Sequence, residues 1–261
     1  MSGTGRIEIN SVSIRFGDFV AVEGADLSID PGEFVCLLGP SGCGKTTLLN
    51  AVAGFVPEIE GSVQVDGVEV DGPHESRGVV FQSTEALFPW LRAIDNVCFG
   101  ARLHRMGKAE RRSVALNHLR LVGLEHAARK FPPQLSGGMR QRLQIARALA
   151  NEPAIVLMDE PFGALDAQTR TVMQTELARI WRATGSTIVF VTHDLDESLL
   201  LADRIVTMTA GPCARIKNIH RVDLARPRDI DDPALRQLHH ELREDIAAEV
   251  AKSMRSEKDI E

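Results

Sequence analysis

A glycine-rich segment between an apolar run and a helix-forming run constrains this chain more than any other feature. The continuous apolar run Phe34–Leu38 is typical of a strand buried on both faces. Thr46–Ala53 predicts a helix that ends with Gly54 as its C-cap. The residues between them match the pattern G-x-x-x-x-G-K-[S/T]. They are Gly39-Pro40-Ser41-Gly42-Cys43-Gly44-Lys45-Thr46.

This context predicts a phosphate-binding loop. Glycines let successive backbone N–H groups turn inward around phosphate oxygens, and the helix N-terminus adds partial positive charge. Lys45 can reach the β- and γ-phosphates of a nucleotide, and the hydroxyl of Thr46 can ligate Mg²⁺. A flexible glycine turn without a ligand is the alternative interpretation, and the flanking strand and helix disfavour it.

A second apolar run, Ile155–Met158, is followed directly by Asp159 and Glu160. In a doubly wound sheet, ligands bind beyond the carboxyl ends of the strands. Asp159 is therefore expected to hold Mg²⁺ through water, and Glu160 to polarise an attacking water as general base. The alternative is that two acidic residues simply open a loop.

The distribution of apolar runs predicts an α/β fold. Short runs broken by turn residues between Ile7 and Ile29, and a further hairpin at Gly61–Val70, indicate an N-terminal antiparallel sheet. Continuous apolar strands at Ile155–Met158 and Thr187–Val191 enclose a helical segment, which indicates a parallel sheet flanked by helices. The separate runs expected at the start are Ile7–Ile9, Val12–Phe16, Val20–Val22 and Leu27–Ile29.

Composition excludes some classes of function. A formal net charge of -6 argues against a general nucleic-acid binder. No N-terminal signal is expected, and no apolar run approaches the roughly 18 residues of a membrane span. We therefore expect a soluble chain that could serve a membrane process only from its side. The four cysteines form no C-x-x-C pair and are expected to be free thiols in a reducing cytosol. They are Cys36, Cys43, Cys98 and Cys213.

The segment Leu135–Gln141 precedes a strong helix at Arg140–Ala150. Ser136 can cap that helix, while Gly137 and Gly138 permit close approach of an anion to the backbone. Standing alone, this is only a capped helix start.

Together these segments resemble the ATPase subunits of ATP-binding-cassette (ABC) transporters, over about Ile7 to Gly211. Gly39–Thr46 resembles the Walker A motif of that family, Ile155–Glu160 its Walker B motif, and Leu135–Gln141 its signature motif. The resemblance implies a P-loop NTPase core with a parallel sheet, an N-terminal antiparallel β-subdomain and an inserted helical subdomain. We expect the nucleotide-binding domain at 1–225, its helical subdomain at about 87–150, and a C-terminal helical tail at 226–261.

Four smaller motifs follow in the family's order. Gln82 resembles the Q-loop glutamine that senses Mg²⁺ and the permease, and Asp166 the D-loop residue at a dimer contact. His193 resembles the switch histidine that touches the γ-phosphate. Phe16 resembles the A-loop aromatic against adenine, where the family more often has Tyr. Taken alone, Gln82 would be an ordinary loop residue, His193 a structural residue at a strand end, and Phe16 a core residue.

The resemblance implies an ATPase that binds ATP and Mg²⁺ between two copies of the chain. The loop of one copy holds ATP, and the Ser136–Gly138 helix start of the other covers it. Its expected catalytic residues are Lys45, Gln82, Glu160 and His193, and its expected metal ligands are Thr46, Gln82 and Asp159. Its expected nucleotide contacts are Phe16, Gly39, Pro40, Ser41, Gly42, Cys43, Gly44, Lys45, Thr46, Thr47, Ser136, Gly137, Gly138 and Asp166.

A finer resemblance is to the ATPases of taurine, aliphatic-sulfonate and nitrate importers. It is carried by Arg77–Gln82, by Ala86–Trp90 with Asp95–Val97, and by Asp159–Ala167. It implies a peripheral subunit at the cytoplasmic face of the cell membrane that energises uptake of a small anionic solute. Its partners would be membrane permease subunits and, indirectly, a solute-binding protein. Because the solute would never touch this chain, its identity lies outside the sequence.

Several alternatives remain open at this stage. An exporter ATPase is the nearest competitor. A non-transport ABC ATPase would normally carry a long coiled-coil insertion or a second cassette, and a P-loop kinase would lack Leu135–Gln141. Phe88 and Trp90 could either dock a permease helix or pack in the core. Asp232 and Pro233 are expected to start a tail helix that docks on its own domain or on a partner. Its apolar stripe would be Leu235, Leu238, Leu242, Ile246 and Val250.

Overall fold

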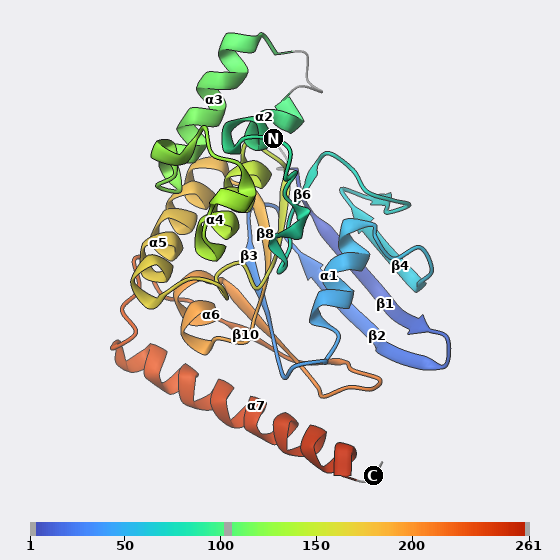
Figure 1. Cartoon of the computed structure of the whole chain (residues 1–261). Helices are drawn as coiled ribbons and strands as arrows, with labels where there is room; N and C mark the ends of the chain where they lie inside the picture. The colour runs from blue at the N-terminus through green and yellow to red at the C-terminus, as the bar shows by residue number, and fades with distance from the viewer. Residues whose placement is uncertain (1–3, 102–105, 259–261) are drawn as a thin grey trace. The chain divides into compact units, whose positions relative to one another are not determined.

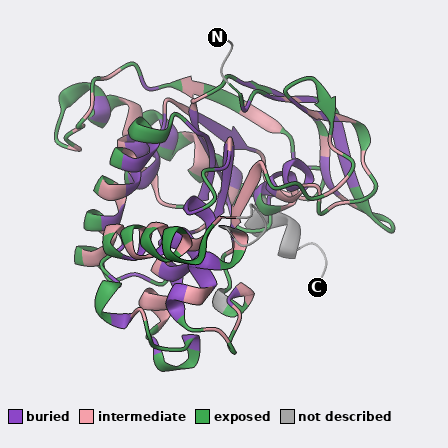
Figure 2. Cartoon of the chain, turned by 90° about the horizontal axis from the view of Figure 1, so that it is seen from above, coloured by how far each residue is buried: buried purple, intermediate pink, exposed green. Residues whose placement is uncertain are grey.

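The computed structural model describes residues 4–101 and 106–258. The chain forms two compact units, which are described separately: residues up to His74 together with those from Thr187 onward, and Glu75–Ser186. The strands buried along their whole length include β3 at Phe34–Leu38, β7 at Ile155–Asp159 and β8 at Thr187–Thr192 (Figure 2), and in the second unit helices also supply much of the buried interior. Among the described residues, no helix has the length and apolar character needed to cross a membrane.

An antiparallel sheet opens the first unit (Figure 1), as the sequence predicts. Its order is β2-β1-β4-β5, with β1 at Ile7–Phe16, β2 at Phe19–Ile29, β4 at Glu60–Val65 and β5 at Val68–Glu69.

The expected break between Ile9 and Val12 is wrong. The pairing of β1 with β2 shifts register there, so the strand continues through a bulge. Ser11 occupies the bulge at φ 47°, and its N–H donates to Asp26 at 2.7 Å. Because this polar residue finds a partner on the neighbouring strand, it does not end β1. The break expected between Val22 and Leu27 is wrong as well, since β2 is continuous.

The core of the first unit is a second sheet with the local order β10-β9-β3-β8. Strand β3, at Phe34–Leu38, is buried at every residue and pairs in parallel with β8 and β9. This confirms that the run before the glycine-rich segment is a strand buried on both faces. The remaining strands are β8 at Thr187–Thr192, β9 at Arg204–Met208 and β10 at Ile216–Arg221.

In the described part of the first unit, three helices complete the fold. They are α1 at Lys45–Ala53, α6 at Leu195–Leu201 and α7 at Pro233–Lys258. Helix α1 ends as predicted at Gly54, whose φ of 82° lies in the left-handed region that favours glycine.

The tail helix α7 docks on its own unit. Asp232 starts it by accepting a hydrogen bond from the Ala234 N–H at 2.8 Å, as the sequence predicts. Leu235 and Leu242 of the predicted apolar stripe are buried. The helix packs against α6 and β9 and runs past β10 (Figure 1).

The second unit combines a parallel strand pair with helices. Strands β6, Arg77–Val80, and β7, Ile155–Asp159, pair in parallel. Where the sequence predicts a helical subdomain, at about 87–150, the described residues form several separate helices. The elements are α2 at Ala93–Ala101, α3 at Lys108–Leu121, α4 at Gly137–Leu149 and α5 at Ala167–Thr184, with short 3-10 turns at Thr84–Ala86, Glu125–Ala127 and Pro132–Gln134.

Candidate functional site

The loop between β3 and α1 has a backbone that requires its glycines. Gly42 and Gly44 adopt φ angles of 75° and 80°, in the left-handed region. A Cβ on Gly44 would lie 2.8 Å from Cγ2 of Val22 and 3.1 Å from the carbonyl oxygen of Ala21. The loop is therefore fixed both by its own dihedral angles and by close packing against β2.

The side chain of Lys45 folds back toward the start of this loop. Its side chain is only 6% exposed, and Nζ donates to the carbonyl oxygens of Gly39 and Pro40 at 2.8 and 2.7 Å. No carboxylate among the residues that the structure describes pairs with this ammonium group. Because its partners are two loop carbonyls and the Cys43 thiol, all of them neutral, the site is suited to an anion.

The start of α1 adds to this suitability. Gly44 is the N-cap and offers no side-chain acceptor, so the first N–H groups of the helix lack a side-chain cap. A helix N-terminus of this kind binds phosphate groups. The loop, Lys45 and the helix start thus fit the triphosphate of a nucleotide. Thr46, on the first turn of α1, is exposed, and Thr47 is partly exposed.

Cys43 lies beneath the loop. It is completely buried, and a Cβ on Gly39 would come within 2.8 Å of its Sγ. Burial raises the pKa of the Cys43 thiol, although the nearby Lys45 ammonium opposes this. The neutral thiol therefore acts as a packing group under the phosphate loop.

Phe16 ends β1 and is 56% exposed. Phe19 faces it across the Gly17-Asp18 turn in the strand register and is 52% exposed. The sequence prediction named only Phe16. The two-residue turn between the strands was the signal that could have identified Phe19, since it places the two rings opposite each other.

His193 follows β8 and is exposed. The residues on either side of it in the sequence form hydrogen bonds with Glu197. Thr192 Oγ1 donates to the buried Glu197 side chain at 2.7 Å, and Asp194 caps α6 by accepting the Glu197 N–H at 3.1 Å. The backbone that carries His193 is thereby fixed, while the imidazole faces outward.

In the second unit, Gln82 and Glu160 meet. Val80 at the end of β6 pairs with Met158 near the end of β7, so the residues that follow these parallel strands emerge side by side. Nε2 of Gln82 donates to Oε2 of Glu160 at 3.1 Å. Glu160 has a φ of 43°, uncommon for a residue with a side chain and typical of functional sites. Asp159, just before it, is buried.

The start of α4 is capped as predicted. Ser136 Oγ accepts the Met139 N–H at 3.3 Å. A Cβ on Gly138 would lie 3.1 Å from Cδ2 of Leu165, so Gly138 permits close packing of the segment before α5.

Asp166 caps α5. It accepts hydrogen bonds from the backbone N–H and from Oγ1 of Thr169, at 2.9 and 2.8 Å. These bonds lower the pKa of Asp166. This capping uses one lone pair of each carboxylate oxygen, and the predicted dimer contact at Asp166 stays a prediction.

The metal ligands expected from the sequence are distributed over both units. Thr46 belongs to the first, and Gln82 and Asp159 belong to the second. Within the described ranges, no group of three or more His, Cys, Asp and Glu side chains could hold a metal. The Thr–Gln–Asp set has the oxygen donors that suit Mg²⁺, a metal that keeps several waters and substrate phosphates as ligands.

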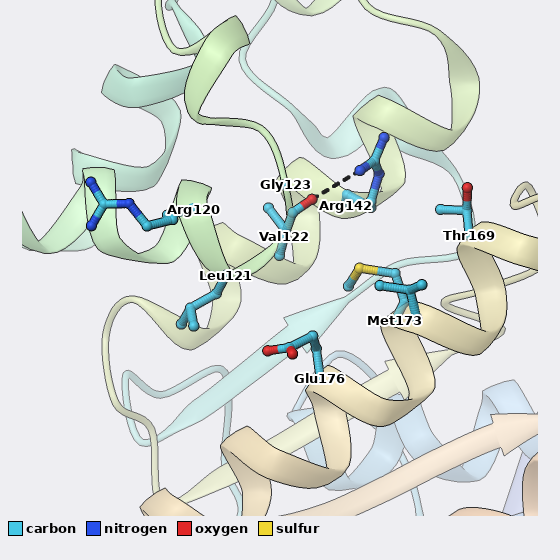
Figure 3. Close-up of a pocket in the computed structure, with 9 residues that line it drawn as sticks. Arg120, Leu121, Val122, Gly123, Arg142, Thr169, Met173 and Glu176 are labelled. Carbon is cyan, nitrogen blue, oxygen red and sulfur yellow. Dashed lines mark hydrogen bonds between the residues drawn. The ribbon is translucent and has the colours of Figure 1, made fainter.

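A cavity of about 320 Å³ lies in the second unit, lined by residues of α3, α4 and α5 (Figure 3). Arg142 donates to the carbonyl oxygen of Val122 at 3.0 Å on one side, and Met173 and Glu176 lie on the other. None of its lining residues is a predicted site residue.

A second hollow in this unit, of about 350 Å³, is aromatic. Phe88 lines it, with its ring centroid 4.4 Å from that of Phe99 and 5.6 Å from that of Trp90. Arg147 lies 5.4 Å from the Phe88 centroid. Trp90 is 70% exposed, so the core interpretation of Trp90 is wrong.

Comparison with known proteins agrees with these motifs. Residues 22–163 match the family model for ABC transporters. The nitrate import ATP-binding protein NrtD of Synechococcus elongatus is 45% identical over 91% of this chain and 90% of its own length. The taurine import ATP-binding protein TauB of Escherichia coli is 48% identical over 79% of this chain and 80% of its own.

A solved structure extends the similarity to the fold. It is a dimeric ATP-binding cassette in a post-hydrolysis state with bound ADP and phosphate. It superimposes with a TM-score of 0.73 at 32% identity, covering 84% of this chain and all of the other.

Proposed function

Because the chain belongs to the ABC transporter family and is an ATPase, we propose that it is the ATP-hydrolysing subunit of an importer for a small anionic solute. The observation that carries the site assignment is the ammonium group of Lys45. It is buried, donates to the loop carbonyls of Gly39 and Pro40 and to the Cys43 thiol, and lies at the start of α1, which has no side-chain cap.

In this proposal the glycine loop and Lys45 bind the β- and γ-phosphates, and the exposed rings at the β1–β2 hairpin stack on adenine. Bound Mg²⁺ would neutralise phosphate charge, with Thr46, Gln82 and Asp159 as its ligands. Glu160 orients the attacking water and accepts its proton, while Gln82 holds the carboxylate through their hydrogen bond. His193 contacts the γ-phosphate. Phosphoryl transfer needs mainly such positioning and charge neutralisation.

A second copy completes the site. The start of α4 supplies Ser136, Gly137 and the positive end of the helix dipole, which suit the γ-phosphate held by the partner copy. The dimeric state of the similar solved cassette supports this arrangement.

The aromatic hollow around Phe88 is proposed as the docking site for a helix of the permease. Exposed Trp90 and half-buried Phe88 offer apolar area, and Arg147 can cap helix carbonyls. Trp90→Asp should leave ATP hydrolysis by the isolated chain intact and abolish its coupling to transport. Val68→Asp, at a similarly exposed apolar position in the first unit, is the matched control.

The names of the similar proteins support a solute such as nitrate or taurine, with this chain peripheral at the cytoplasmic membrane face. The test is ATP hydrolysis by the chain reconstituted with its permease and receptor in lipid vesicles. Nitrate, bicarbonate, taurine and an alkanesulfonate should be compared. Stimulation by one of them through the receptor supports the importer. Full activity and transport without any receptor would instead indicate an exporter.

A further inference from the structure

The C-terminal helix α7 is connected to the phosphate loop by a short series of contacts inside the first unit. Glu249 lies on the inner face of α7 and is only 2% exposed. Its Oε1 pairs with Lys217 and Lys252 at 2.9 and 2.7 Å. Its Oε2 accepts the backbone N–H of Ala210 at 3.1 Å.

Ala210 belongs to the turn that joins β9 to β10, residues 209–215, here called the β9–β10 turn. The next residue, Gly211, lies against the phosphate loop: a Cβ placed on it would come within 2.9 Å of the carbonyl oxygen of Gly42. Just before the turn, the carbonyl oxygen of Met208 is 3.2 Å from the Cβ position of Gly39. The turn thus lies against the loop at Gly42, and the end of β9 lies against it at Gly39.

The other side of the turn is held by β2. The N–H of Cys213 donates to the Val20 carbonyl at 2.8 Å, and the N–H of Glu23 donates to the Ala214 carbonyl at 2.9 Å. These bonds fix one side of the turn, and Glu249 fixes the other. The Ala210–Gly211 segment is therefore held on two sides where it lies close to Gly42.

We infer that Glu249 is a positioning residue for nucleotide binding, which acts through Ala210 and Gly211 to keep Gly42 in its phosphate-binding conformation. The inference rests on the proposed role of Gly39–Thr46. Gly42 has a φ of 75°, and a small change there would turn loop N–H groups away from the phosphates. A hydrogen bond to a carboxylate is well suited to this task, because it is stronger than one between neutral groups.

Glu249→Ala removes the acceptor of the Ala210 N–H. We expect the KM and Kd for ATP to rise about tenfold, with kcat changed by less than about twofold. Glu249→Gln retains an amide oxygen and should recover most of the affinity. Gly211→Ala presses on the Gly42 carbonyl from the same turn, so it should raise the KM similarly. The effects should not add in the double variant, since both changes disturb one contact.

Two controls separate positioning from general stability. Asp245→Asn, on the same face of α7, weakens bonds to Lys217, Thr207 and Asn218 but touches no residue of the β9–β10 turn. Lys252→Ala removes an ion pair of Glu249 and leaves its Ala210 bond intact. Neither variant should change the KM for ATP, whether or not its melting temperature falls.

Lys45→Ala tests the underlying assignment independently. If Lys45→Ala binds ATP like the wild type, the proposed phosphate loop itself is wrong. If Lys45→Ala loses binding while Gly211→Ala and both Glu249 variants keep the wild-type KM, the positioning role of Glu249 is contradicted. An equal KM increase in Asp245→Asn and Glu249→Ala would also contradict it. Should Glu249→Ala fail to fold, Glu249→Asp replaces it: its shorter side chain withdraws the carboxylate from the Ala210 N–H, so the KM for ATP should rise, and an unchanged KM would contradict the role.

Discussion

The side-chain amide of Gln82 donates a hydrogen bond to the carboxylate of Glu160, with 3.1 Å between Nε2 and Oε2. Both residues follow the carboxyl ends of a parallel strand pair, which brings together positions that are distant in the sequence. The left-handed φ of Glu160 stores backbone strain at the same place. The hydrogen bond and the backbone conformation together fix the orientation of the Glu160 carboxylate.

Replacing Glu160 by Gln should abolish turnover and preserve nucleotide binding. The amide keeps the shape of the side chain but cannot accept a proton, so kcat should fall about 100-fold or more. Phosphate release and equilibrium ATP binding are the measurements. Glu152→Gln is a matched control, because Glu152 also has a positive φ, 47°, and is exposed. Ordinary turnover by Glu160→Gln would show that the base is elsewhere.

Removing the cap of α5 should destabilise the protein. Asp166→Ala loses the two hydrogen bonds with Thr169, and we expect the free energy of unfolding to fall by about 1 kcal/mol. Asp166→Ser restores an acceptor and should recover most of this loss. Urea unfolding measures both. Equal stability of Asp166→Ala and the wild type would mean that the cap contributes nothing.

The thiol of Cys43 should react slowly and in competition with ATP. Burial raises its pKa, so the thiolate is scarce near pH 7 and alkylation should accelerate as the pH rises. Exposed Cys213 should react first. Peptide mass spectrometry after iodoacetamide treatment, with and without ATP, follows each cysteine separately. A rate at Cys43 that ATP leaves unchanged would contradict its position beneath the phosphates.

The docking of α7 should depend on pH in the acid range. Burial opposes the charge on Asp245, but hydrogen bonds from Lys217, Asn218 and Thr207 outweigh it and lower its pKa to about 2. Burial likewise opposes the charge on Glu249, while Lys252, Lys217 and the Ala210 N–H lower its pKa to about 2. These folded-state pKa values lie below the ordinary values near 4. The stabilisation is therefore complete above about pH 5 and is lost as the pH falls toward 2.

Asp245→Asn should accordingly lower the free energy of unfolding at pH 7 by about 1–3 kcal/mol and flatten its decline below pH 5. The exposed ion pair of Asp231 with Arg236 provides the control, since Asp231→Asn should have little effect. An identical acid profile for the wild type and Asp245→Asn would rule out this contribution.

The sequence predicts those features that depend on neighbouring residues. The strand–loop–helix around Lys45, the Ser136 cap and the left-handed Gly54 follow from local patterns, and the structure confirms them. Local patterns do not predict contacts between residues that are far apart in the sequence. Gln82 and Glu160 meet only because β6 and β7 pair in parallel.

Glu249 shows that local sequence patterns also fail to predict which charged side chains are buried. In a helix rich in Lys, Arg, Asp and Glu, its carboxylate has the pattern of a solvated surface group, yet it is buried against the β9–β10 turn. Sequence periodicity identifies the apolar stripe of α7 but not the polar residues beside it that also face inward. Which charges are buried is decided by partners from distant elements, such as Lys217 on β10.

The central claim is that ATP is bound by the Gly39–Thr46 loop of one copy and covered by the Ser136–Gly138 helix start of another. Light scattering of the Glu160→Gln chain with and without ATP and Mg²⁺ tests it most directly. The account predicts twice the monomer mass with ATP, and monomer mass when Ser136→Glu is added. A mass that ATP does not change, at concentrations that saturate the site, would contradict it.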